Sequence, residues 1–415
     1  MKIFFNLIYL ILFVNNISAD EISKIDIANE YYLNFDFENA KLIYSEILKT
    51  DTSNLDALLG LGNISLKKEN YSKAKYFYEK VINIDSTYLI PYINLSIMYS
   101  NQEDYQSAND IIIKASLIDP FDNNLLYYKG FSFYKLGKYD EAIKDILLLI
   151  SNGETQKKTY QLLADCYYMK NQFNVAIKYY NQILLDNPLD VKALFQRALF
   201  LSMLNKEKEA IIDYLQILTI NKNNIIALTN LGLLYLELKQ YTNAITYFDR
   251  VYILDSTNSE ILINRAYAYK KSKNELKAKK DLFYLISHQV NLPESYNMLG
   301  LIYKDSDKLD SSLYFLKLAY KYDSSNASIC NNLGESFRYN MDFDSALFYI
   351  KKAITLNQED ADFYHSLASV YFDLNEIDNE LVAINKCLES LDQNEINFNL
   401  DSLKLRKSEI SIKIN

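Results

Sequence analysis

The chain has 415 residues, of which 49% are hydrophobic and 23% charged, and its formal net charge at pH 7 is −9. An acidic chain lacks the basic surface that nucleic acids and anionic membranes attract, so we expect neither as a partner. Length alone would suggest two or three globular domains. Only 8 glycines and 4 prolines interrupt the chain, and this scarcity favours long helical stretches.

The first 19 residues have the pattern of a secretory signal peptide. Lys2 precedes an apolar run, and Ala19 ends the segment just before Asp20. The run is shorter than the roughly 20 apolar residues of a membrane-spanning helix. We therefore expect cleavage after Ala19, export to a periplasmic or extracellular location, and no integral membrane span in the mature chain. The alternative is a membrane tether formed by an uncleaved segment.

The stretch 228–255 predicts two short amphipathic helices separated by a turn. Gly232 and Tyr235 share a helical face in the first, and Ala244 and Phe248 share one in the second. The small residues Gly232 and Ala244 would let the helices approach closely. One such hairpin cannot cover its own apolar surface, so it needs neighbours.

Neighbours recur at a fixed period of 34 residues. The positions equivalent to Gly232 are all small: Ala28, Gly62, Ser96, Gly130, Ala164, Ala198, Ala266, Gly300, Gly334 and Ala368. The positions equivalent to Ala244 are Ala40, Ala74, Ala108, Ala142, Ala176, Ala210, Ala278, Ser312, Ala346 and Glu380. A mostly large residue occupies the position of Tyr235, filled elsewhere by Tyr31, Ser65, Tyr99, Phe133, Tyr167, Leu201, Tyr269, Tyr303, Phe337 and Tyr371. The period indicates a repeat array in place of separate domains.

The sequence resembles the tetratricopeptide repeat (TPR) family, whose 34-residue unit has the pattern W-x2-L-G-x2-Y, then A-x3-F, then P. The resemblance implies an all-α fold: an α-solenoid superhelix of eleven helix-turn-helix repeats over residues 20–394, followed by a C-terminal capping helix over 395–415. The repeats would span about 21–54, 55–88, 89–122, 123–156, 157–190, 191–224, 225–258, 259–292, 293–326, 327–360 and 361–394. Trp is absent, and the closing Pro occurs only at Pro120 and Pro188.

The last segment has the composition of a cap. Its apolar residues are Phe398, Leu403, Ile410 and Ile414, and its cations are Lys404, Arg406, Lys407 and Lys413. We expect a helix that covers the last repeat and turns its charged side outward, as open-ended stacks require for solubility. Glu380 replaces the small residue in this final repeat, which is atypical as terminal repeats usually are.

No constellation for catalysis, metal binding or cofactor binding is evident. His288 and His365 lie about two repeats apart, and a solenoid brings only neighbouring repeats into contact. The odd number of cysteines argues against a complete disulfide framework, so we expect Cys166, Cys330 and Cys387 to be buried thiols. We predict a protein that is not an enzyme and that needs no cofactor or metal.

The resemblance also implies a concave groove lined by the first helix of each repeat. In the fourth repeat Tyr127, Phe131 and Tyr134 share one face of that helix. The next two repeats place Asp165, Tyr168, Phe195 and Leu199 at equivalent positions. We define these seven residues as the aromatic belt. They form either an apolar binding surface or ordinary packing between neighbouring first helices.

A second feature is a recurring amide two residues before the small-residue site. Its members include Asn94, Gln196, Asn230, Asn264 and Asn332, and they are joined by Lys270, Lys304, Asn331 and Arg338. Side-chain amides can bind the backbone of an extended peptide, and they can equally bind sugar hydroxyls. Drift to Asn in an AT-rich genome is the alternative. The Lys and Asn pair with which some TPR domains hold a C-terminal carboxylate has no match here.

These observations favour a non-catalytic scaffold that holds an extended protein segment in its groove. The predicted groove residues are Tyr127, Phe131, Tyr134, Asp165, Tyr168, Phe195, Leu199, Asn230, Asn264 and Asn332. The competing hypothesis is a polysaccharide-binding or glycan-export accessory protein, because aromatic faces stack on sugar rings. A regulatory subunit of an enzyme encoded elsewhere is a third hypothesis.

Overall fold

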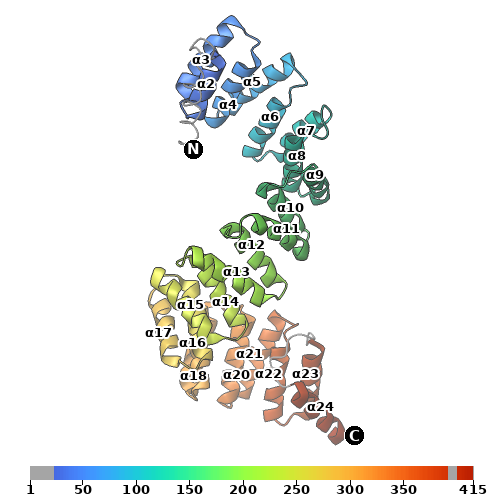
Figure 1. Ribbon diagram of the computed structural model, residues 1–415. Helices are drawn as coiled ribbons and strands as arrows, with labels where there is room; N and C mark the ends of the chain where they lie inside the picture. Colours follow the sequence, from blue (N-terminus) through green and yellow to red (C-terminus); the bar gives the residue numbers. More distant parts are fainter. Residues whose placement is uncertain (1–22, 391–399, 415) are drawn as a thin grey trace. The chain divides into compact units, whose positions relative to one another are not determined.

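The computed structural model describes residues 23–390 and 400–414, and in this part of the chain it is all-α, with 23 helices and no strand (Figure 1). The helices form two compact units, one ending at Lys206 and the other beginning at Glu207. The first unit contains α2 (Lys24–Leu33), α3 (Phe37–Thr50), α4 (Leu55–Lys67), α5 (Tyr71–Ile84), α6 (Ile90–Asn101), α7 (Tyr105–Ser116), α8 (Asn123–Lys135), α9 (Tyr139–Ser151), α10 (Lys157–Met169), α11 (Phe173–Asp186) and α12 (Val191–Met203). The second contains α13 (Glu207–Ile220), α14 (Ile225–Glu237), α15 (Tyr241–Leu254), α16 (Ser259–Lys271), α17 (Glu275–Ser287), α18 (Leu292–Asp305), α19 (Leu309–Tyr322), α20 (Ala327–Tyr339), α21 (Phe343–Leu356), α22 (Ala361–Asp373), α23 (Ile377–Ser390) and α24 (Leu400–Ile414).

Within each unit every helix packs against the next helix along the chain. The two helices of one repeat, such as α14 and α15, contact each other, and α15 then contacts α16 of the next repeat. First helices of neighbouring repeats, such as α14 and α16, also touch. Contacts restricted to neighbours are those of an α-solenoid, so the predicted fold class is confirmed.

Small residues set the distance between the two helices of a repeat. A Cβ atom added at Gly232 would lie 2.3 Å from Cε1 of Phe248, and one added at Gly62 would lie 2.5 Å from Cε1 of Tyr78. Such distances are far inside van der Waals contact, so a larger residue at Gly232 or Gly62 would require the facing ring to move. Ala244 on the facing helix is fully buried.

Several Asn and Asp residues cap the N-termini of helices. The side chain of Asn224 caps α14 by accepting a hydrogen bond from the Ala227 amide at 2.9 Å, and Asn258 does the same for α16. The turn inside a repeat uses the left-handed conformation, as at Lys239 with φ of 57°. These local bonds satisfy amide groups that the helix itself leaves unpaired.

The C-terminal helix α24 packs on α23 through Leu403 and Ile410, which are buried as predicted. The expectation that all its charges point outward is wrong for Arg406. Its Nε and one terminal nitrogen donate to the two carboxylate oxygens of Glu380 at 2.8 and 3.0 Å. Glu380 lies at the position that is small in the other repeats, and here α23 packs against α24. Phe398 and the signal segment lie outside the described residues.

The three cysteines are buried and free, which confirms the expectation that they act as apolar core residues. Burial raises the pKa of the Cys166 thiol to about 12, and the nearby Asp165 adds to the rise. The thiol therefore stays protonated at neutral pH. Among the described residues, no helix combines the length and apolar character that a membrane crossing requires.

Candidate functional site

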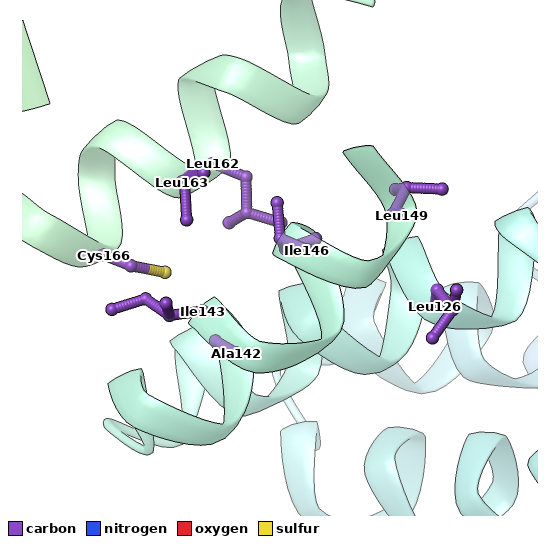
Figure 2. Packing of buried hydrophobic residues seen from close by; sticks show 8 residues of the cluster. All are labelled: Leu126, Ala142, Ile143, Ile146, Leu149, Leu162, Leu163 and Cys166. Atoms are coloured by element: carbon purple, nitrogen blue, oxygen red, sulfur yellow. The ribbon is translucent and has the colours of Figure 1, made fainter. Parts of the chain in front are cut away.

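The fourth repeat supplies three rings of the aromatic belt from one helix. Tyr127, Phe131 and Tyr134 lie on α8, and each is partly buried. All three pack against a core cluster shared by α8, α9 and α10. The cluster, shown in Figure 2, consists of Leu126, Ala142, Ile143, Ile146, Leu149, Leu162, Leu163 and Cys166. The rings therefore contribute to packing between repeats and still keep part of their surface exposed.

Lysine ammonium groups lie over these three rings. The Lys158 ammonium is 4.7 Å from the ring centre of Tyr127. The Lys135 ammonium is 5.6 Å from that of Phe131 and 5.9 Å from that of Tyr134. A cation above an aromatic face is attracted by the ring quadrupole. The belt thus offers apolar faces next to positive charges.

The belt continues onto α10. Burial raises the pKa of Tyr134 on α8, and the nearby charge of Asp165 on α10 raises it further. Tyr168 stacks on Phe200 of α12, with ring centres 5.0 Å apart and planes inclined by 15°. The structure therefore brings Tyr134, Asp165 and Tyr168 into one region.

Asp165 takes part in a hydrogen bond within its own repeat. Its carboxylate accepts a hydrogen bond from the Tyr180 hydroxyl at 3.2 Å. The equivalent positions of the first two repeats hold Asn29 and Asn63, which accept the same bond from Tyr44 and Tyr78 at 2.6 and 2.9 Å. Burial raises the pKa of Asp165 above its ordinary value. Its role as a ligand-binding residue stays a prediction.

The sixth repeat supplies the last two members of the belt. Phe195 and Leu199 lie on α12 and are partly buried. They occupy the same helix as Phe200, on which Tyr168 stacks. Belt residues therefore come from α8, α10 and α12, the three first helices at this end of the first unit.

The predicted groove amides of the second unit, Asn230, Asn264 and Asn332, form what we call the amide row, and they are partly engaged within the fold. Asn230 donates to the Ile226 carbonyl of its own helix at 2.8 Å. Asn332 on α20 donates to the side chain of Asn297 on α18 at 3.0 Å. Asn264 lies partly buried on α16. The structure places these residues on separate first helices, and their role in ligand binding stays a prediction.

The cations near the amide row link neighbouring repeats. Lys270 pairs with Asp305 at 2.6 Å, and Lys304 pairs with Glu335 at 2.6 Å. Arg338 pairs in the same way with Asp373 at 2.7 Å. Each acid lies about one repeat after its cation. These cations therefore link neighbouring repeats. An acidic residue about one repeat after each cation is the sequence pattern that could have predicted these pairs.

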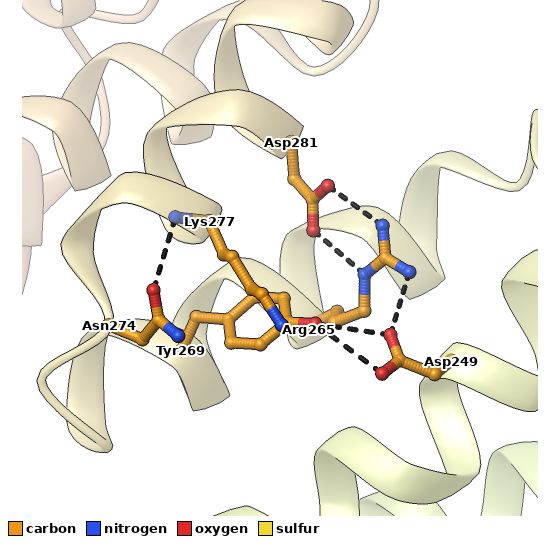
Figure 3. Close-up of polar contacts among 6 residues, drawn as sticks. All are labelled: Asp249, Arg265, Tyr269, Asn274, Lys277 and Asp281. Atoms are coloured by element: carbon orange, nitrogen blue, oxygen red, sulfur yellow. Dashed lines mark hydrogen bonds and ion pairs between the residues drawn. The ribbon is translucent and has the colours of Figure 1, made fainter.

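Sequence reasoning missed a buried polar centre in the eighth repeat. Arg265 on α16 binds Asp281 of α17 and Asp249 of α15 (Figure 3). Its guanidinium also lies 3.9 Å from the ring centre of Tyr252. These residues line a pocket of about 340 Å³ whose rim includes Lys277. Arg265 is paired with both acids, so its guanidinium is already engaged within the fold.

A second pocket, of about 300 Å³, is lined by residues of α20, α22, α23 and α24. Arg338, His365, Phe372 and Arg406 line it, and the Arg406 guanidinium is 4.9 Å from the ring centre of Phe372. Arg406 comes from beyond the last repeat, so the repeat register could not reveal this pocket. Among the described residues, no group of three or more His, Cys, Asp or Glu could hold a metal ion.

The paired helices, the strict neighbour contacts and the small residues at each crossing define a helical-repeat protein of the solenoid class. The chain belongs to the tetratricopeptide repeat family. Models described as tetratricopeptide repeat match residues 55–88, 125–152, 162–225, 225–258, 293–326, 327–360 and 361–390. Together these ranges make up more than half of the chain.

Solved structures of the same fold are similar at low identity. The yeast Tom70 is 14% identical, over 94% of this chain and 95% of that one, with a TM-score of 0.48. A tetratricopeptide repeat protein from Parabacteroides merdae is 19% identical, over 60% of this chain and 98% of that one, with a TM-score of 0.42. YrrB, a TPR protein with an unusual peptide-binding site, is 16% identical over 45% and 95%, with a TM-score of 0.39. No curated protein matches the chain.

Proposed function

We propose that the protein is a non-catalytic scaffold that holds an extended protein segment against the first helices of its fourth to sixth repeats. The observation that carries the proposal is the aromatic belt, whose rings on α8 are half-buried with lysines above them and whose ring on α10, Tyr168, is also half-buried. Rigid aromatic anchors give contact area at a small loss of side-chain entropy. A scaffold of this kind needs no catalytic group.

The chemistry of the belt fits a segment with apolar and acidic residues. Tyr127, Phe131 and Tyr168 would pack against its apolar side chains, while Lys135 and Lys158 would attract its carboxylates. Successive first helices present these groups along one direction. An extended ligand could therefore make several modest contacts, whose sum gives useful affinity.

Replacing rings by leucine tests the belt while retaining apolar packing. We expect the triple variant Tyr127→Leu, Phe131→Leu and Tyr134→Leu to bind peptides selected on the wild-type chain at least about tenfold more weakly, because buried aromatic anchors dominate such interfaces. Binding is measured by fluorescence anisotropy. Circular dichroism would show that the helices remain.

The matched control changes three rings on second helices, which are 44% to 61% exposed: Phe283→Leu, Tyr314→Leu and Phe348→Leu. We expect this variant to bind like the wild type. Equal affinity of both triple variants would contradict the belt as the binding surface. A glycan that binds with high affinity and resists peptide competition would instead support the polysaccharide hypothesis.

We also propose that the scaffold acts outside the cytoplasm. The support is the pattern of the first 19 residues, with Lys2 before an apolar run and Ala19 at the expected cleavage site. The test is the mass of the N-terminal peptide from protein isolated from the envelope or the medium. A mature N-terminus at Asp20 is expected, and retention of Met1 in a cytoplasmic fraction would contradict export.

A further inference from the structure

Four repeats stack two aromatic rings between their own helices. One ring comes from the first helix, three residues after its small residue. The other ring comes from the second helix, also three residues after its small residue. The stacks are Tyr167 on Tyr179 at 5.8 Å and 11°, Tyr235 on Tyr247 at 5.5 Å and 4°, Tyr303 on Phe315 at 5.3 Å and 8°, and Phe337 on Tyr349 at 5.4 Å and 4°. The ring of the first helix therefore covers one face of the ring of the second helix.

The second repeat has only half of this pair. Phe77 holds the second-helix position, but the first-helix position is Ser65, whose hydroxyl donates to the Leu61 carbonyl of its own helix at 2.7 Å. A pocket of about 400 Å³ lies here, lined by Leu61, Ser65 and Phe77. The pocket is therefore the slot that an aromatic ring fills in the four sister repeats.

The cations that accompany such a ring are also present. The ammonium group of Lys279 lies 4.4 Å from the ring centre of Tyr303 in the ninth repeat. Lys279 comes from the second helix of the preceding repeat, one residue after its small residue. The ammonium group of Lys277 lies 5.3 Å from the ring centre of Tyr269 in the eighth repeat. Lys277 comes from the second helix of the same repeat, one residue before its small residue. The corresponding residues around Ser65 are Lys41 and Lys73, and both line the pocket.

The charges at the rim are only partly balanced within the fold. Lys68 pairs with Glu38 and lowers the pKa of that carboxyl, and the charge of Lys41 lowers it further. The ammonium groups of Lys41 and Lys73 form no hydrogen bond or ion pair with any residue of the described ranges 23–390 and 400–414. The pocket thus joins an open aromatic face to surplus positive charge in a chain of net charge −9. Its complement is an aromatic ring next to negative charge.

We propose that this pocket binds the aromatic side chain of a partner protein segment in which acidic residues flank a Tyr or Phe. The incoming ring stacks on Phe77 in the position that Tyr235 takes on Tyr247 in the seventh repeat. Lys41 and Lys73 contact its face and edge and pair with the flanking carboxylates. The site lies on the first two repeats, apart from the belt, and goes beyond the function proposed above.

The test uses a fluorescent peptide with one Tyr between Asp and Glu residues, added to the purified chain. The same peptide with Ala in place of Tyr, and one with Lys flanks, are compared. We expect saturable binding of the acidic Tyr peptide. The affinity of each of the other two peptides should be at least about tenfold lower. Binding of all three with one affinity, or of none, would overturn the proposal.

Ser65→Tyr is the decisive variant, because it fills the slot with the ring that the sister repeats carry. It should abolish binding while the helices remain intact by circular dichroism. Ser72→Tyr, at an exposed position of α5 that does not line the pocket, should bind normally. Undiminished binding by Ser65→Tyr would refute the site and leave the belt untouched.

Charge is tested separately. Lys41→Gln with Lys73→Gln should weaken binding and reduce its salt dependence, whereas Lys49→Gln with Lys67→Gln, exposed lysines that do not line the pocket, should change neither. The same loss in both double variants would show that only the overall charge matters. The assay does not involve the belt variants, so its failure is distinguishable from failure of the proposed scaffold function.

Discussion

Arg265 donates to both carboxylate oxygens of Asp281 at 2.8 Å, and each of these side chains is only 7% exposed. The same two positions of the fourth repeat hold Lys129 and Asp145, which pair at 3.0 Å. In the seventh repeat the positions are Leu231 and Tyr247, and in the ninth Leu299 and Phe315. A buried ion pair and an apolar pair are thus alternative solutions for one contact.

This alternation predicts that the pair can be exchanged as a unit. Arg265→Leu alone leaves Asp281 buried without its cation and should cost about 3–5 kcal/mol in the free energy of unfolding. Arg265→Leu with Asp281→Tyr recreates the residues of the seventh repeat and should come within about 1 kcal/mol of the wild type, or exceed it. Urea unfolding followed by circular dichroism measures both. A double variant as unstable as the single one would disprove the equivalence.

The C-terminal helix should detach when its ion pair is broken. Glu380 has a side chain only 4% exposed, so Arg406→Met leaves a buried carboxylate without a cation. We expect a local cost of about 3–5 kcal/mol and a loss of amide protection in α24, with little effect on distant repeats. Hydrogen exchange measured by mass spectrometry follows α24 directly. Lys404→Met, at an exposed position of the same helix, serves as the control and should preserve protection.

Asp165→Asn should stabilise the protein at neutral pH. Burial raises the pKa of Asp165, so its ionised form is less favourable in the folded chain than in the unfolded chain. The ionised carboxylate of Asp165 therefore destabilises the folded chain. This destabilisation is absent below the unfolded pKa of about 4, and it develops as the pH rises from there through the higher folded pKa. Asn retains the acceptor for Tyr180, as Asn63 does for Tyr78.

We expect a gain of about 0.5–1 kcal/mol at pH 7 for Asp165→Asn, which vanishes toward pH 3. Denaturant unfolding of both proteins across this pH range gives the difference. A gain that is constant with pH would show that ionisation of Asp165 is not its cause. A loss at pH 7 would mean that the charged form is favoured in the fold.

Ser65→Tyr should stabilise the first unit as well as close the proposed binding slot. A ring stacked on Phe77 adds about 1 kcal/mol beyond the burial of its apolar area, as aromatic pairs generally do. The change is measured as a higher urea midpoint, with Ser72→Tyr as the reference for an added ring on the surface. A lower midpoint would mean that the second repeat has no room for the ring.

The sequence by itself determined the repeat unit. The 34-residue period and the small residues at positions such as Gly232 and Ala244 predicted the helix pairs, because helix formation and close crossing depend on residues near one another in the chain. The turn at Lys239 and the cap at Asn224 follow from the same local chemistry.

Only the tertiary structure decided which side chains remain available to a ligand. Lys304 is paired with Glu335 and Asp165 accepts from Tyr180, whereas the slot above Phe77 lies open. Burial and pairing depend on side chains one helix or one repeat away, so the spacing of residues along the chain does not reveal them. The repeat pattern identifies the positions at which ligands can bind, and three-dimensional packing determines which of them are already occupied.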